Sequence, residues 1–417
     1  MQSTVRAEWR NGRYLVIAAS FGVGLSSAPI YSLGAFIEPL HAAFGWNRTQ
    51  IVLAQAIFSL VVTGVSPPVG ALLDRYGPRR LALSGTVIAS LALAMLSRLQ
   101  GSYPLYLLTW GVLALGVGLA SSLVWLRAVV ERFSQQRGLA MSVALCGSNI
   151  AGAIAPVLVI ALIGRAGWRL AYVGLALYLL LSIFPLAYGV FYGSRELVHA
   201  GTQPERAAAA PLDSLPGLET AAAVRSREFW LLAAAFLLGG GAITSFVVHM
   251  IPMLTDRGMA PLLAASIVSG MNIAAVLGRV ASGFLMDRVF ATRLAAIAML
   301  LPVPACLLLL NAPATYTYAG CGAVLIGLST GAEFNMISFL AARYFGLRRL
   351  GVLAGILFAC FSAGSILMPP LTGMLFTLRG DYDAAIQALA GAFAIAGAAL
   401  FLCRRYPDLP RAGSGAG

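Results

Sequence analysis

Apolar residues recur along the chain in twelve long segments, each bounded by a short polar or charged stretch. A helix needs about 17 to 25 apolar residues to cross the hydrocarbon core of a bilayer, and these segments have that length or slightly more. The pattern therefore predicts an all-α membrane protein with twelve transmembrane helices. The predicted spans are 14–40, 50–73, 81–97, 104–130, 138–163, 170–191, 229–254, 262–286, 294–310, 316–342, 350–378 and 384–403.

The composition supports this class. Of the 417 residues, 59% are hydrophobic and only 10% are charged, and the mean hydropathy is +0.86. A soluble protein carries about 25% charged residues. The net charge is +13, and all 28 basic residues are arginine, because the chain has no lysine. Most arginines fall in segments predicted to be cytosolic, which is the positive-inside bias. No basic stripe interleaved with aromatic residues indicates nucleic-acid binding.

Between the sixth and seventh segments lies the one long polar insertion, rich in Ala, Pro, Gly and charge. It predicts a flexible cytosolic linker at residues 192–228 between an N-terminal half, 1–191, and a C-terminal half, 229–417. Six spans on either side put both termini on the cytoplasmic side. The five cysteines lie in or beside apolar segments without metal-ligand spacing, so we interpret them as packing residues.

The two halves repeat each other. Residues 70–80 are echoed 213 residues later by residues 283–293, and a second echo relates residues 133–152 to 345–364. Two parallel six-helix repeats with a midplane cavity are typical of a secondary transporter, although a duplicated structural bundle would repeat in the same way. The matched positions in the first echo are Gly70/Gly283, Asp74/Asp287, Arg75/Arg288 and Arg80/Arg293.

Arg279 is the charge that needs an explanation, because it lies well inside the predicted span 262–286. Such residues nearly always face a protein interior or an aqueous cavity. Helical spacing puts the small or polar residues Asn272, Ala275 and Ser282 near its face, which leaves space for a compact anion. Arginine matches a carboxylate in bidentate fashion. We expect a substrate anchor; the alternative is an arginine paired with an acid on a neighbouring helix.

Glu333 is a second intramembrane charge, within the tenth span. A buried carboxylate near an arginine can be tuned to bind and release a proton. We expect Glu333 and Arg279 to face one cavity; a fixed ion pair or a packing carboxylate is the alternative. Ser329, one turn earlier, lies on the same face. Tyr31 and Asn272 are further candidate substrate contacts, and both suit ordinary packing as well.

The pattern Gly327-Leu-Ser-Thr-Gly331 matches the nucleophile motif of hydrolases, but it lies inside an apolar helix instead of a strand–turn–helix elbow. Two glycines four residues apart favour close helix packing there. No nucleophile, metal or cofactor constellation is present in the sequence, so we do not expect an enzyme, a bound metal or a cofactor.

The architecture and the run at 70–80 resemble the major facilitator superfamily, in which a charged turn of this kind lies between helices two and three. The resemblance implies a gating role for Asp74, Arg75, Asp287 and Arg288, whose contacts change during transport, and close helix approach at the motif glycine.

A narrower resemblance is to the monocarboxylate transporters and their oxalate/formate-type bacterial relatives. It rests on residues 132–140 followed by Gly147–Gly152 and on residues 344–351 followed by Pro369. It implies that Arg279 is the family's substrate-anchoring arginine. The mammalian members carry an aspartate where this chain has Ala275 and a first-helix lysine where it has Tyr31, so the resemblance does not extend to the mammalian proton relay.

These observations predict a transporter of small monocarboxylates, coupled to protons, working by alternating access in a bacterial inner membrane. Its partners would be the carboxylate, a proton and the lipid bilayer, and a monomer is sufficient. The alternatives are an organic-anion exchanger without net proton movement, an exporter of other small molecules, or a ligand sensor that does not transport.

Overall fold

The computed structural model describes residues 2–133, 137–190, 217–286, 288–311, 315–346 and 348–406. In these ranges the regular structure is helical, apart from one isolated antiparallel bridge between Gly217 and Gly346. The helices are α1 (Gln2–Phe44), α2 (Arg48–Tyr76), α3 (Pro78–Leu96), α4 (Tyr103–Leu119), α5 (Ser122–Arg132), α6 (Arg137–Val190), α8 (Thr220–Arg225), α9 (Arg227–Thr255), α10 (Pro261–Met286), α11 (Ala291–Leu300), α12 (Pro302–Asn311), α13 (Tyr316–Phe345), α14 (Leu350–Arg379) and α15 (Asp383–Phe401).

The twelve predicted spans all fall on these helices, which confirms the all-α membrane class. Two spans are each built from two helices, α4 with α5 and α11 with α12. Two others join in α6, which turns at Gly167, where φ is 78°. Only glycine adopts this backbone conformation without strain. The tenth span, α13, bends by 45° between Glu333 and Met336.

Contacts divide the chain into two compact units. Unit 1 contains residues 1–205, 247–255 and 260–272, and unit 2 contains 206–246, 256–259 and 273–417. Helices α9 and α10 therefore contribute residues to both. The predicted halves, 1–191 and 229–417, stay a prediction, and of the predicted linker the residues 191–216 lie outside the described residues.

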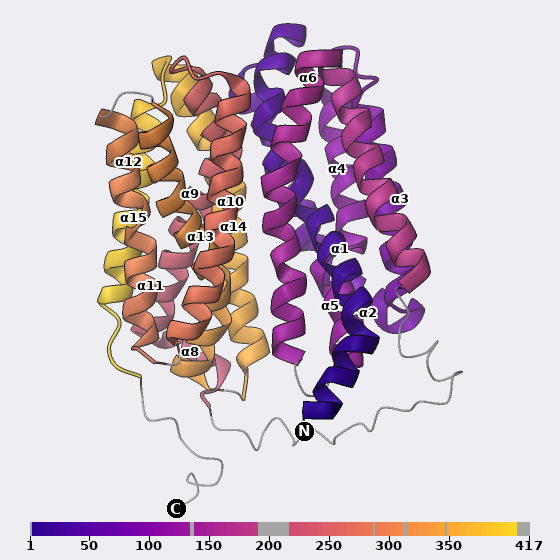
Figure 1. Ribbon diagram of the computed structural model, residues 1–417. Coiled ribbons are helices and arrows are strands. Elements are labelled where there is room, and N and C mark those ends of the chain that lie inside the picture. The colour runs from indigo at the N-terminus through magenta and orange to yellow at the C-terminus, as the bar shows by residue number, and fades with distance from the viewer. Residues whose placement is uncertain are drawn as a thin grey trace, which may run out of the picture. The chain divides into compact units, whose positions relative to one another are not determined.

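In unit 1, α1 packs along α6, and α3 packs against both α4 and α6 (Figure 1). The backbones of α1 and α6 touch, because a Cβ at Gly147 would lie 1.8 Å from the carbonyl oxygen of Ser20. The aromatic rings of Phe36 on α1 and Tyr172 on α6 stack at 3.8 Å between centroids. Glycine and aromatic residues thus pack these helices, as expected where no water is available to drive association.

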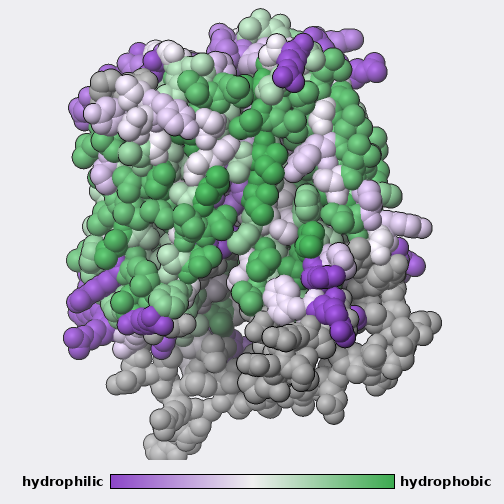
Figure 2. All heavy atoms as spheres, viewed as in Figure 1, coloured by the Kyte–Doolittle hydropathy of each residue, from purple (hydrophilic) through white to green (hydrophobic). Residues whose placement is uncertain are grey.

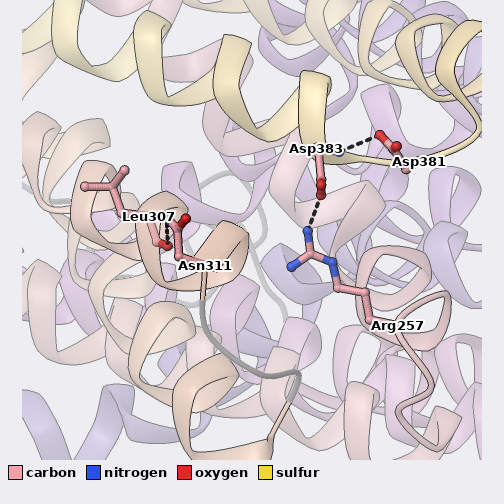
Figure 3. A network of polar contacts seen from close by, with 5 residues as sticks. All are labelled: Arg257, Leu307, Asn311, Asp381 and Asp383. Atoms are coloured by element: carbon pink, nitrogen blue, oxygen red, sulfur yellow. Dashed lines mark hydrogen bonds and ion pairs between the residues drawn. The ribbon is translucent and has the colours of Figure 1, made fainter.

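In unit 2, α11 packs against α13 and α15 (Figure 1). Gly364 of α14 allows a close backbone contact, as Gly147 does in unit 1. A Cβ at Gly364 would lie 1.9 Å from the carbonyl oxygen of Leu237 on α9. Arg257, after α9, pairs with Asp383 at the first turn of α15 (Figure 3). A carboxylate in the first turn of a helix is itself favourable.

Large apolar side chains are exposed along the spans, among them Leu60, Leu108, Leu181 and Val280. Figure 2 shows hydrophobic side chains covering the middle of the helices and hydrophilic ones gathered near their ends. A soluble protein does not expose so much apolar surface, whereas a bilayer solvates it. The molecule is a multi-pass membrane protein.

Candidate functional site

Helices α10 and α13 cross with their backbones in contact. A Cβ at Gly331 would lie 1.8 Å from the carbonyl oxygen of Ala275, and a Cβ at Gly278 would lie 2.3 Å from that of Leu328. Real Cβ atoms do not approach other atoms so closely, so both positions require glycine. The predicted close packing at Gly331 is therefore confirmed, and its partner is the helix that carries Arg279.

Arg279 lies at this crossing, with its backbone nitrogen 2.7 Å from the Cβ position of Gly331. Its side chain is half-buried, and its carbonyl accepts a hydrogen bond from Ser282 at 3.1 Å. At about 100° per residue, Arg279 is turned about 130° away from the apolar stripe that α10 exposes. That stripe consists of Ile273, Leu277, Val280 and Phe284. The guanidinium therefore belongs to the protein side of the helix.

Glu333 stands two residues beyond Gly331, at the start of the bend in α13. It is 2% exposed. Its Oε1 lies 3.0 Å from the position that a Cβ of Gly239 on α9 would occupy. The sulfur of Met299 on α11 lies 2.6 Å from that same position. The carboxylate thus lies where α9, α11 and α13 meet. Its Oε1 has no hydrogen-bond partner among the described residues.

Sequence reasoning missed this environment. Gly239 belongs to three consecutive glycines in the seventh span, 239–241, and that run is the signal that a bulky or polar group needs space beside α9. Ser329, one turn before Glu333, is fully buried, and its hydroxyl has no hydrogen-bond partner among the described residues. Arg279, Ser329 and Glu333 all belong to unit 2.

Tyr31 and Asn272 come together in unit 1, around Gly152 of α6. A Cβ at Gly152 would lie 2.4 Å from Oδ1 of Asn272 and 3.0 Å from Cδ1 of Tyr31. Asn272 donates from Nδ2 to the carbonyl of Val268 at 2.9 Å, whereas its buried Oδ1 accepts no hydrogen bond from the described residues. Substrate binding by these two residues stays a prediction.

The gating residues are only partly described. Asp287 lies outside the described residues, as does the side chain of Asp74. Arg75 is exposed over the ring of Tyr76 at 5.3 Å, and Arg288 is exposed over Phe284 at 3.6 Å. The gating role stays a prediction.

The motif glycines have no close neighbour among the described residues. A Cβ at Gly70 or Gly283 would meet no described atom within 4 Å. Close helix approach at the motif glycine stays a prediction.

No group of three or more His, Cys, Asp or Glu side chains within the described part of the chain is arranged to hold a metal ion. The polar side chains described within the spans include the guanidinium of Arg279, the carboxylate of Glu333, the buried imidazole of His249, and hydroxyls and amides. This set suits recognition of a small anion and offers no nucleophile with an adjacent base.

The profile of the Major Facilitator Superfamily matches residues 19–358, which is most of the chain. The chain belongs to the major facilitator superfamily. This superfamily transporter moves a small molecule across a lipid bilayer and is not an enzyme. The resemblance predicted from the motif at 70–80 is thereby confirmed.

Individual relatives fall into two groups. The chain is 30% identical to monocarboxylate transporter 13 of Rattus norvegicus over 395 residues, which is 94% of this chain and 88% of that protein. It is 28% identical over 416 residues to monocarboxylate transporter 11 of Mus musculus, covering 96% and 88% of the two chains. It is also 27% identical over 383 residues to the fujikurins efflux protein of Gibberella fujikuroi, covering 90% and 78%. These relatives are eukaryotic, so the bacterial inner membrane stays a prediction.

Proposed function

We propose that this protein is a secondary transporter of small monocarboxylates that couples their movement to protons by alternating access. Arg279 binds the substrate carboxylate, and Glu333 carries the proton. Both termini face the cytoplasm.

The observation that carries the proposal is the position of Arg279. It lies seven residues, about 10 Å, before the end of α10 at Met286 and is turned away from the lipid-facing stripe. An arginine at the centre of a span costs about 2.5–3.5 kcal/mol on insertion scales, so it needs a function or a buried partner. Its planar fork offers two parallel hydrogen bonds to a carboxylate.

Glu333 supports the proton-binding part. An ionised carboxylate buried without a hydrogen-bond donor or cation is strongly disfavoured, whereas a protonated one is tolerated. Oε1 of Glu333 lies beside the Cβ position of Gly239 and has no hydrogen-bond partner among the described residues, which suits the protonated form. In the proposed cycle a substrate carboxylate occupies Arg279 while Glu333 is protonated. Release of the substrate then allows the ionised Glu333 to approach Arg279.

The relatives support the substrate class, because two of those described above are named monocarboxylate transporters. The fungal relative named as an efflux protein favours a second candidate, the export of other small molecules. Ala275, in the place of the mammalian aspartate, is consistent with that alternative, because the chain then lacks the mammalian proton relay.

The test is uptake into proteoliposomes of labelled lactate, pyruvate, acetate, benzoate and oxalate under an inward proton gradient. We expect accumulation of at least one monocarboxylate that an uncoupler abolishes and that Arg279→Ala eliminates. Accumulation that the uncoupler leaves intact would favour an exchanger. Saturable binding without accumulation would favour a sensor. Folded protein that neither binds nor accumulates any of these acids would overturn the monocarboxylate assignment.

A further inference from the structure

Unit 1 contains an apolar groove that no part of the proposed transport cycle uses. Its volume is about 540 Å³, and it lies between α3 and the second half of α6, two helices that pack side by side (Figure 1). Ser90 is its only polar lining residue. The others are Val87, Leu91, Ala94, Val173, Ala176, Leu177, Leu180, Leu181, Phe184 and Pro185.

The rim of the groove is open to the surroundings. Leu91 is 61% exposed, and Leu181 is 66% exposed. Both helices are long and apolar enough to span a membrane, so the surroundings are lipid. An unfilled apolar groove forfeits the dispersion contacts of its walls. Within the bilayer the available molecules that can restore those contacts are acyl chains.

The α3 side of the groove follows one helical stripe that leads to Arg80. Val87 and Ala94 stand seven and fourteen residues after Arg80, and residues seven apart share a helix face. Arg80 is exposed, and it lies about 10 Å from Val87 along the axis. A cation therefore stands at the end of the groove, at the distance that separates a headgroup from an acyl chain.

Other contacts at this end also suit a phosphate. Arg79 donates to the carbonyl of Tyr188 at 2.6 Å and lies over its ring, which ties α3 to α6. The ring of Tyr188 is 62% exposed, and such amphipathic rings favour the headgroup level. Gly77, which precedes α3, supplies no side-chain acceptor to the first N–H groups of the helix. These groups leave a positive helix end near Arg80.

We propose that the α3–α6 groove binds an acyl chain of an anionic phospholipid whose phosphate pairs with Arg80. The hydrocarbon of the groove does not select among lipids, because acyl chains are equally well solvated by the bilayer. Selection for negative charge comes from the arginine end. Ser90 lies ten residues, or about 15 Å along the helix axis, past Arg80, which is the depth of the bound acyl chain and not of the headgroup.

The test uses the full-length protein in nanodiscs with a phospholipid that carries a photoactivatable diazirine near the middle of one acyl chain. Phosphatidylglycerol and phosphatidylcholine with identical chains are compared, and labelled peptides are mapped by mass spectrometry. We expect adducts concentrated in residues 87–94 and 173–185, with phosphatidylglycerol labelling several-fold more than phosphatidylcholine.

Two variants separate the parts of the site. Arg80→Gln should lower phosphatidylglycerol labelling of the groove about fivefold and leave phosphatidylcholine labelling unchanged. Ala94→Phe fills the groove and should lower both. The matched controls are Arg293→Gln, at the exposed arginine that echoes Arg80, and Leu108→Phe, on the exposed face of α4; neither should change labelling of the groove.

Adducts spread evenly over exposed positions such as Leu277 and Val280 would mean bulk annular lipid only and would overturn the proposal. An Arg80→Gln variant that keeps the wild-type preference for phosphatidylglycerol would overturn the role of Arg80. Because the readout is lipid labelling, the result does not depend on which substrate is transported.

Discussion

Unit 2 brings α10 against α13, and unit 1 brings α2 against α4. The 213-residue offset of the sequence repeat aligns these pairs, so that Gly331 corresponds to Gly118. Both glycines lie at the crossing. A Cβ at Gly331 would lie 1.8 Å from the carbonyl oxygen of Ala275, and one at Gly118 would lie 2.5 Å from Cγ2 of Val65. Both spans also break just beyond this point, α13 by a 45° bend and α4 where it gives way to α5.

The chemistry at the two crossings differs. Unit 1 has Ser66 and Ala120 at the positions that Arg279 and Glu333 occupy in unit 2. Ser66 donates to the carbonyl of Val62 at 2.8 Å, which satisfies it within its own helix. The crossing in unit 1 therefore forms without any charge. Intramembrane charges are costly, so their presence at the crossing in unit 2 alone is the difference on which the proposed function rests.

The largest effect on transport is expected when Arg279 of α10 is replaced by serine, the residue at the matching position 66 of α2. If Arg279 binds the substrate as proposed, Arg279→Ser removes two hydrogen bonds to the carboxylate, each worth about 1.5–3 kcal/mol, so uptake should fall at least about 100-fold. The matched variant Ser66→Ala should transport normally. Initial rates of labelled lactate uptake into proteoliposomes give the comparison. Equal losses in the two variants would mean that the crossings do not differ in function.

The next largest effect concerns the glycines. Gly331→Ala forces a methyl group against the backbone of α10, and overpacking of this kind costs roughly 1–3 kcal/mol. Gly118→Ala meets the end of the Val65 side chain, which can rotate, so its cost should be smaller. Gly70→Ala enters open space and should be neutral. Thermal unfolding of the three variants in detergent measures the order, and any other order contradicts the described crossing.

Glu333→Gln tests whether the buried carboxylate couples protons. Glutamine keeps the size of the side chain but cannot exchange a proton, so accumulation driven by a proton gradient should fall about tenfold. Substrate counterflow without a gradient should continue. If proton-driven uptake persisted at the wild-type level, Glu333 would be a packing residue. Ala120→Gly, at the matching position in unit 1, serves as the control for disturbance of the break.

The smallest effect is expected at the turn after α13. Glu219 pairs with Arg348 at 2.9 Å, and the Leu218 N–H donates to the carbonyl of Phe345 at 2.8 Å. An exposed ion pair contributes about 0–1 kcal/mol, so Glu219→Gln should leave the unfolding temperature nearly unchanged. Hydrogen exchange of residues 217–225 should nevertheless become faster. Unchanged exchange would show that the backbone bonds alone hold this segment.

Much of the fold was predictable, because a helix that crosses a bilayer must satisfy its own backbone and bury apolar side chains over a known length. Joined or broken spans were harder to predict. The turn within α6 depends on Gly167, and the breaks within the fourth and ninth spans lie inside continuous apolar segments. The hydrophobicity of a segment does not predict where its helix bends, because the residues before and after the bend both remain in lipid.

The candidate site was predictable residue by residue but not as an arrangement. Arg279 and Glu333 stand out because each is a charge in an apolar run. Among the described residues, Gly278 and Gly331 make the close helix contact, whereas Gly70 and Gly283 have no neighbour within 4 Å of the Cβ position. A glycine's neighbours depend on how its helix is rotated and which helix it meets.

The sequence by itself determined the class of the protein, the number of its spans, the internal repeat and the two charges that distinguish the second half. These properties follow from the cost of placing polar groups in hydrocarbon, which acts on each segment separately. Only the tertiary structure decided that Arg279 lies at a glycine crossing and that Oε1 of Glu333 lies beside Gly239. Helix packing depends on the shapes of two surfaces at once, so neither helix alone contains that information.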